Sequence, residues 1–219
     1  YRPQADRLIS YTAWRDRFFS ATAASYLDQG GDGVYCFNWF PKKDDWGPLL
    51  RSMGSLETLA GTDKLYSVLR RSPTYLDGAG PNAVNDRIYG QTATVLMPTL
   101  TGDGPTFTLS QHDDVVARAA DLTALQLHIE ISHWAPEDEV AVSLDGNELG
   151  APAIVDVAEN ESAPPRVSEK NWLVWDVKPE QIAKGQHQIK IVLVNRDSRI
   201  SVPLTICLLY TSDAADEGL

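Results

Sequence analysis

The sequence predicts a mixed fold of class α/β plus all-β, in which an α/β segment precedes an antiparallel β-sandwich. A helical stripe leads into a solid apolar run within residues 12–40, whereas strict alternation of apolar residues begins near residue 91. A solid apolar run is typical of a strand covered on both faces, and alternation is typical of a strand with one wet face. The Gly- and Pro-rich stretch 73–81 separates the two, so we expect domains over 1–80 and 81–206.

The first domain is expected to contain a helix that feeds a buried strand. Residues 12–29 place apolar side chains at helical spacing, and Gly30-Gly31 would end that helix. The run 34–40 is almost wholly apolar, and Pro41 would end it as a strand. A helix joined to such a strand by a short Gly-rich loop is typical of an α/β fold.

Two more helical stretches are expected before the domain boundary. One covers residues 49–59 and is interrupted by Gly54. The other covers 63–71, with Thr62 as its N-cap.

The second domain is expected to be a jelly-roll-like β-sandwich. Asp145-Gly146 is a hairpin turn signal between two of its strands. Short alternating runs separated by turn residues are typical of such sandwiches. The expected strands are 92–97, 106–110, 125–131, 139–144, 154–157, 172–177, 188–194 and 200–205.

Charge and composition exclude several functions. The net charge of −11 argues against nucleic-acid or anionic-membrane partners, because both require basic surfaces. No apolar run is long enough to span a bilayer, and no phosphate-binding or metalloprotease motif is present. We therefore expect no cofactor and no metal, and we interpret His112-Asp113-Asp114 as a solvated turn.

Residues 207–217 resemble a translated transposase sequencing adapter of the kind found at the ends of metagenomic contigs. On that resemblance we interpret 207–219 as an artefactual tail and leave it out of the predicted fold. Cys36 is then the one remaining cysteine, which excludes a disulfide within the rest of the chain. Because the chain also lacks an initiator Met, we expect it to be a fragment of a longer protein.

Residues 26–40, with Gly-Gly-Asp-Gly before an aliphatic-aromatic run containing Phe-Asn, resemble the closing strand of bacterial glycosyl-hydrolase-like TIM barrels. Residues 140–149 are similar to the C-terminal, galactose-binding-like sandwich of those proteins, with Asp145 where Asn is usual. The resemblance implies the C-terminal fragment of a (β/α)8 barrel followed by a sandwich. It also implies a secreted or periplasmic bacterial protein whose partner is a carbohydrate.

Candidate binding residues follow from the barrel interpretation, because barrel enzymes carry their sites at the carboxyl ends of the strands. Trp39 would stack on a sugar ring, Asn38 would bind its hydroxyl edge, and Trp46 would form a wall of the same pocket. The alternative is that these side chains fill the barrel core. Asp44-Asp45 is an acidic pair nearby, but adjacent loop carboxylates normally point apart into solvent.

The sequence leaves three functions open. The chain is part of a glycoside hydrolase whose catalytic carboxylates lie upstream, or a non-catalytic carbohydrate-binding module, or a structural sandwich that packs against the rest of the protein. An exposed aromatic platform on the sandwich would favour binding, and a buried sandwich face would favour packing. Trp134 in a sandwich loop is a candidate for either role.

Overall fold

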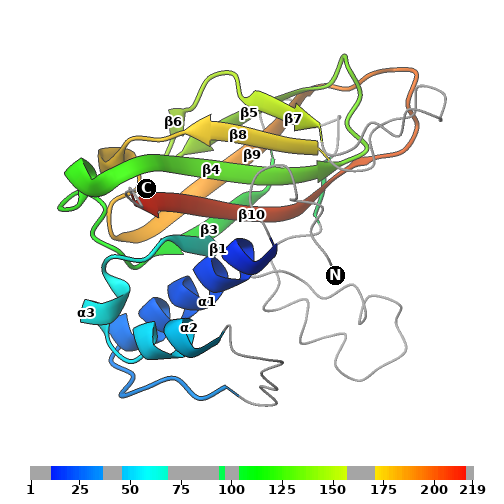
Figure 1. The fold of residues 1–219 in the computed structure, drawn as a ribbon. Helices are drawn as coiled ribbons and strands as arrows, with labels where there is room; N and C mark the ends of the chain where they lie inside the picture. Colours follow the sequence, from blue (N-terminus) through cyan, green and yellow to red (C-terminus); the bar gives the residue numbers. More distant parts are fainter. Residues whose placement is uncertain (1–10, 37–45, 69–93, 97–103, 157–170, 216–219) are drawn as a thin grey trace.

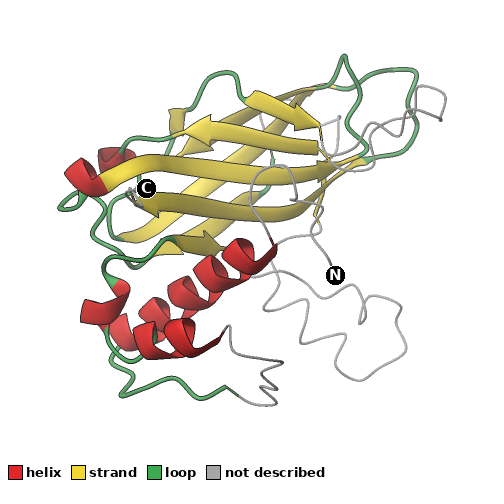
Figure 2. Ribbon diagram, viewed as in Figure 1, coloured by secondary structure: helices red, strands yellow, loops and turns green. Residues whose placement is uncertain are grey.

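The computed structural model describes residues 11–36, 46–68, 94–96, 104–156 and 171–215, which form a two-layer antiparallel β-sandwich flanked by helices (Figures 1 and 2). One sheet has six strands, in the order β1-β10-β4-β8-β7 with β2 also paired to β10, and the other has the order β3-β9-β5-β6. The six-stranded sheet contains β1 (Lys64–Ser67), β2 (Thr94–Leu96), β4 (Leu122–Ser132), β7 (Ala153–Asp156), β8 (Asn171–Asp176) and β10 (Leu204–Ala215). The four-stranded sheet contains β3 (Thr106–Gln111), β5 (Glu139–Leu144), β6 (Asn147–Glu148) and β9 (Gly185–Asn195).

Alternating side chains from the two sheets fill the space between them. Leu127 and Ile129 of β4 meet this interior and are fully buried, as are Ile189 and Ile191 of β9. Burying one such side chain contributes about 1.5–3 kcal/mol. The alternating apolar residues that predicted a sandwich are therefore the ones that line the inner faces of both sheets. The sandwich prediction is confirmed for the described strands.

The turn between β5 and β6 forms where the sequence predicted it. Asp145 and Gly146 both have positive φ angles, 50° and 81°, as a two-residue type I′ hairpin turn requires. The Asp145 carboxylate lies 2.7 Å from Nδ1 of His187, and it accepts a hydrogen bond from the backbone N–H of Gln188, also at 2.7 Å. The hairpin is thereby fixed to β9.

Three α-helices in the described part of the chain pack beside the six-stranded sheet. They are α1 (Tyr11–Asp28), α2 (Gly47–Ser52) and α3 (Leu56–Leu59), and 3-10 turns occupy Ala119–Asp121 and Pro179–Gln181. The long helix α1 packs along β1, and Gly30, with φ 91°, follows its end, so this predicted helix and its glycine stop are confirmed. Helices α2 and α3 correspond to the predicted stretch 49–59.

The barrel prediction is wrong. All described strand pairs are antiparallel, and three helices beside a sandwich do not make a fragment of a (β/α)8 barrel. The key run 34–40 is described only through Cys36, and residues 34–36 form no strand. Tyr35 is 86% exposed, whereas the side chains of a barrel strand are sheathed on both sides. Apolar composition alone did not distinguish a buried strand from an irregular segment.

The helix expected over 63–71 is also wrong, because Lys64–Ser67 forms strand β1. Its partner is β10, in a register that places Tyr66 opposite Thr211. The helical spacing of its apolar residues was overridden by this long-range pairing. The capped helix lies just before it: Ser55 accepts a hydrogen bond from the backbone N–H of Thr58 and starts α3.

Strand β10 lies between β1 and β4 and includes residues that the sequence interpretation set aside as a tail. Leu209 is fully buried and Tyr210 is 4% exposed, so this segment is an integral inner strand. The origin of residues 207–219 as adapter sequence stays a prediction. So does the division at residue 80, although β1 shares a sheet with strands from the second predicted domain.

Candidate functional site

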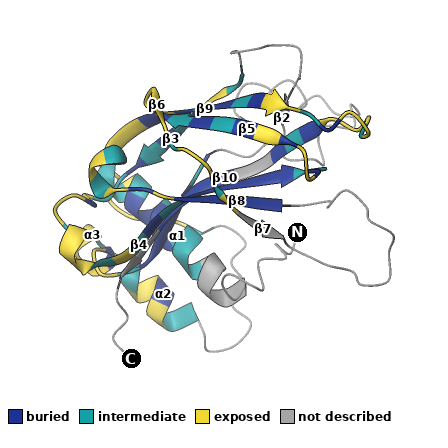
Figure 3. Ribbon diagram, turned by 90° about the horizontal axis from the view of Figure 1, so that it is seen from above, coloured by how far each residue is buried: buried dark blue, intermediate teal, exposed yellow. Residues whose placement is uncertain are grey.

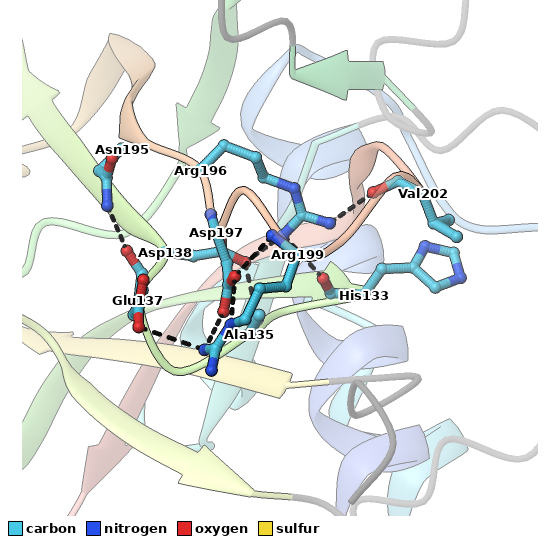
Figure 4. Close-up of polar contacts among 9 residues, drawn as sticks. All are labelled: His133, Ala135, Glu137, Asp138, Asn195, Arg196, Asp197, Arg199 and Val202. Atoms are coloured by element: carbon cyan, nitrogen blue, oxygen red, sulfur yellow. Dashed lines mark hydrogen bonds and ion pairs between the residues drawn. The ribbon is translucent and has the colours of Figure 1, made fainter.

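Two loops meet at one end of the sandwich and form a cluster of polar contacts (Figure 4). Residues 133–138 connect β4 to β5, and residues 196–203 connect β9 to β10. We call this cluster the loop-end site; its residues are His133, Ala135, Glu137, Asp138, Asn195, Arg196, Asp197, Arg199 and Val202.

Asp138 joins the two loops from beneath. Its side chain is fully buried and accepts hydrogen bonds from the backbone N–H of Ala135, at 2.6 Å, and of Asp197, at 2.7 Å. The guanidinium of Arg196 also contacts this carboxylate, and it donates a hydrogen bond to the carbonyl of His133 at 3.2 Å. A second contact from Arg196 reaches the carbonyl of Val202. A buried carboxylate that accepts this many hydrogen bonds fixes both loops.

A second acid-base pair lies above the first. The Asp197 carboxylate accepts hydrogen bonds from Nε and Nη2 of Arg199 at 2.9 and 2.6 Å, and from the backbone N–H of Arg199 at 3.0 Å. The side-chain and backbone bonds from Arg199 lower the pKa of Asp197 to about 2, and the same pairing raises the pKa of Arg199. Asp197 is thus held as a carboxylate and cannot donate a proton near neutral pH.

The outer rim of the loop-end site is open to solvent. Glu137 and Arg199 have side chains that are 61% and 65% exposed, with Oε1 of Glu137 lying 3.3 Å from Nη2 of Arg199. Asn195 is exposed and donates from Nδ2 to the backbone carbonyl of Glu137 at 2.7 Å. Val202, 45% exposed, adds an apolar surface. The rim therefore presents hydrogen-bond donors and acceptors on a rigid base.

His133 stands at the entrance to this loop in a left-handed backbone conformation, with φ 65°. Such a φ is uncommon outside glycine, although histidine is among the residues enriched there. The next residue, Trp134, is 9% exposed and belongs to the hydrophobic core. Packing beneath the loop is therefore the role that the structure gives Trp134, and it is not an exposed platform for a sugar.

The binding residues predicted from the sequence do not meet in the described part of the chain. Asn38 and Trp39 lie outside the described residues. Trp46 precedes α2, is half-buried, and packs edge-to-face against Phe19 of α1 with ring centroids 6.1 Å apart. Since the barrel pocket that motivated this assignment is not part of the fold, the binding role of Trp46 stays a prediction.

Two histidine-carboxylate pairs resemble the start of a catalytic arrangement. His187 has Nδ1 2.7 Å from Asp145 and Nε2 2.6 Å from the carbonyl of Ala183, so neither ring nitrogen is left to act as a base. His112 has Nδ1 3.0 Å from Asp28, which also binds Lys184. Both pairs connect structural elements.

The turn that contains His112-Asp113-Asp114 is held by contacts within the protein. Asp113 lies 2.9 Å from Nζ of the fully buried Lys64. Asp114 accepts a hydrogen bond from the backbone N–H of Ala117 at 3.0 Å. Among the described residues, no group of three or more His, Cys, Asp or Glu side chains could hold a metal ion.

Sequence reasoning missed the loop-end site. The available signal was the charged segment Arg196-Asp197-Ser198-Arg199 between two alternating strands, together with Glu137-Asp138 in another loop. Their meeting depends on two antiparallel pairings, β4 with β10 and β5 with β9, which bring both loops to the same end of the sandwich.

No protein-family model and no curated protein matches the chain. Among solved structures, the chain is similar to a two-domain esterase active on acetylated mannans, co-crystallised with mannopentaose, at 13% identity and a TM-score of 0.30. That match covers 69% of this chain and 33% of the esterase. A second structure of a two-domain esterase active on acetylated mannans matches at 14% identity and a TM-score of 0.30, covering 70% and 34%. The chain thus spans about a third of these structures, and so slight a likeness carries no argument about function.

The fold and site define a class: a β-sandwich with a helical flank and a rigid polar rim at one end. In the described part of the chain, no helix is long and apolar enough to cross a membrane.

Proposed function

We propose that this chain is a non-catalytic carbohydrate-binding β-sandwich module whose ligand contacts the loop-end site. The observation that supports this proposal is the exposed set of Glu137, Asn195 and Arg199, held on the buried base of Asp138. The ligand class also draws on the sequence resemblance to galactose-binding-like modules.

The chemistry of the rim suits a neutral sugar. Sugar hydroxyls both donate and accept hydrogen bonds, the Glu137 carboxylate accepts, and the guanidinium of Arg199 donates. Arg199 is already neutralised by Asp197 and Glu137, and the chain carries a net charge of −11, so an anionic ligand would be repelled. Pre-ordered loops reduce the entropy lost on binding.

A hydrolase is not proposed. The hydrolase interpretation depended on a barrel with carboxylates on its earlier strands, and the fold is not a barrel. The Asp197 carboxylate of the loop-end site is paired with Arg199, which lowers its pKa and does not suit proton donation. A secreted or periplasmic location, as expected for a protein that binds extracellular glycans, remains part of the proposal.

The test is glycan binding by the full chain. A panel of neutral oligosaccharides, mannans and galactans included, would be measured by isothermal titration calorimetry with the wild type and with Glu137→Ala. A hydrogen bond to a charged group is worth about 1.5–3 kcal/mol, so the substitution should weaken binding by about tenfold or more.

The matched control is Glu148→Ala, which changes an exposed Glu on β6 at the other end of β5. This variant should bind as the wild type does. Absence of binding to any glycan at millimolar concentration would contradict the proposal, as would an equal loss in both variants.

A second candidate is a structural module, and one observation favours it. On the face of the six-stranded sheet that points away from the sandwich interior, Trp172 and Tyr210 are buried, at 3% and 4% exposed. These two aromatic side chains therefore do not form the exposed platform that would have favoured binding. In the titrations above, absence of glycan binding from a folded protein would favour this packing role.

A further inference from the structure

A histidine is buried in the outward-facing side of the six-stranded sheet without hydrogen-bond partners. His128 of β4 is 5% exposed, and neither Nδ1 nor Nε2 has a hydrogen-bond partner in the described structure. Leu127 and Ile129 on either side of it face the sandwich interior, so His128 points the other way. Figure 3 shows that the inner strands of this sheet are buried along most of their length.

Aromatic side chains hold the imidazole from the two neighbouring strands. Tyr210 of β10 lies directly opposite His128 and stacks on it, with ring centroids 4.7 Å apart and an interplanar angle of 15°. Trp172 of β8 meets the imidazole edge-on at 6.3 Å and Tyr210 at 5.5 Å. The three rings form one aromatic cluster that bridges β8, β4 and β10.

The charged groups around the cluster come from two of its strands, β4 and β8, and from the helical flank. Glu130 is on β4 and 1% exposed, and Asp176 on β8 acts on His128 through space. Arg17 of α1 acts electrostatically on Tyr210 from the helical flank, as does Glu130. Both nearby acids lie on the sheet, and neither is hydrogen-bonded to the imidazole.

We propose that His128 is the trigger of an acid-sensitive conformational switch, in which protonation of this buried imidazole loosens the packing of β4 against β8 and β10. The neutral ring fits the aromatic cluster. An imidazolium carries two N–H donors and a charge, and burying it without acceptors is costly. Glu130 and Asp176 would draw the charged ring out of the stack.

The direction of the pH effect follows from burial. Desolvation lowers the pKa of His128 to about 4 from its usual value near 6.5, and Asp176 offsets part of that effect. A loosened state with the usual pKa binds the proton at higher pH than the closed state does. The closed state is therefore fully favoured above about pH 6.5 and loses stability as the pH falls toward 4.

The experiment is hydrogen exchange of the full chain at pH 7 and pH 5, corrected for intrinsic rates, with His128→Phe as the variant. Phenylalanine keeps the stacked ring and cannot be protonated. For the wild type, the opening equilibrium of peptides from β4, β8 and β10 should rise about 20-fold between the two pH values, as the two pKa values require. His128→Phe should show no such rise, and an equal rise in both proteins would overturn the proposal.

A second measurement uses only the native protein, so it does not depend on whether the variant folds. The ring protons of His128 in the native protein would be followed by NMR as the pH is lowered. A titration midpoint below about 5, accompanied by broadening of the Trp172 and Tyr210 ring signals, supports the switch. A midpoint near the ordinary value, about 6.5, would overturn it.

Discussion

The loop-end site and the aromatic cluster around His128 bury polar groups in opposite ways. At the loop end, Asp138 and Asp197 are almost completely buried, and each carboxylate receives several hydrogen bonds. In the aromatic cluster, the His128 ring is buried, and neither of its nitrogens has a hydrogen-bond partner among the residues that the structure describes. A paired buried charge fixes structure, whereas an unpaired buried base is stable only while it stays neutral. The comparison shows that burial alone does not say how a polar group responds to acid.

The largest effect should come from breaking the pairing at the loop end. Asp138→Ala leaves the largely buried guanidinium of Arg196 without its carboxylate and leaves the backbone N–H groups of Ala135 and Asp197 without an acceptor. Removing one partner of a buried ion pair typically costs about 3–5 kcal/mol of unfolding free energy. Urea denaturation at pH 7 would measure this loss.

Glu137→Ala, one residue earlier in the same loop, is the control, because the Glu137 side chain is exposed and its loss should change stability by about 0.5 kcal/mol or less. If the two variants were equally stable, the buried pair would not be what holds the loops together.

The loop-end site and the aromatic cluster should lose stability in different pH ranges. Because hydrogen bonds from Arg199 hold the pKa of Asp197 at about 2, below its unfolded value of 3.8, the stability that Asp197 contributes is present above pH 3.8. It is lost only as the pH falls through about 2. The stability linked to neutral His128 is lost at higher pH, as the pH falls from about 6.5 toward about 4.

At pH 4.5, limited digestion with an acid protease should therefore cut within β4 or β8 before it cuts within 133–138 or 196–203. Digestion of His128→Phe under the same conditions is the control and should be slower in β4. First cleavage within the loops of the wild type would be inconsistent with this order.

The smallest effect should come from substituting Asp28, because its carboxylate is paired, like those of the loop-end site, but is partly exposed to solvent. Its carboxylate, at the end of α1, binds Lys184 and lies 3.0 Å from Nδ1 of His112, so it connects the helix to the end of β3 and the start of β9, which pair in the four-stranded sheet. The hydrogen bond from Lys184 lowers the pKa of Asp28 most, burial opposes this, and His112 adds to the lowering.

Asp28→Asn should cost about 0.2–1 kcal/mol at pH 7, as is typical of partly exposed pairs. Because the pKa of Asp28 is depressed in the folded state, its contribution is present above 3.8 and declines below it, so the difference between variant and wild type should shrink in acid. Thermal melts at pH 7 and pH 3 would measure both effects. A difference that grows in acid would contradict the assignment.

Much of the sandwich could be predicted because its signal is local. Strands β5 and β9 follow strict alternation, and β5 was predicted with the bounds that it has, Glu139–Leu144. The Asp145-Gly146 turn needed only the φ preferences of two residues. Of the candidate site, only the charged loop residues were visible, and nothing in their spacing indicated that 133–138 and 196–203 meet.

The wrong predictions share a cause. Lys64–Ser67 has helical spacing but pairs with β10, and residues 34–36 are apolar in part yet lie outside any sheet. Leaving out residues 207–219 removed the partner of β1 from consideration, so the position of that strand could not be inferred.

The amino-acid sequence by itself determined the alternation of the strands, the hairpin turn and the helix that ends at Gly30-Gly31, because these depend on side-chain period and on backbone preferences within a few residues. The tertiary structure alone decided that β10 lies between β1 and β4, that Asp138 meets Arg196, and that His128 is sealed between Tyr210 and Trp172. These contacts join residues far apart in the chain, and their energies come from desolvation and pairing, which exist only once the sheets have assembled.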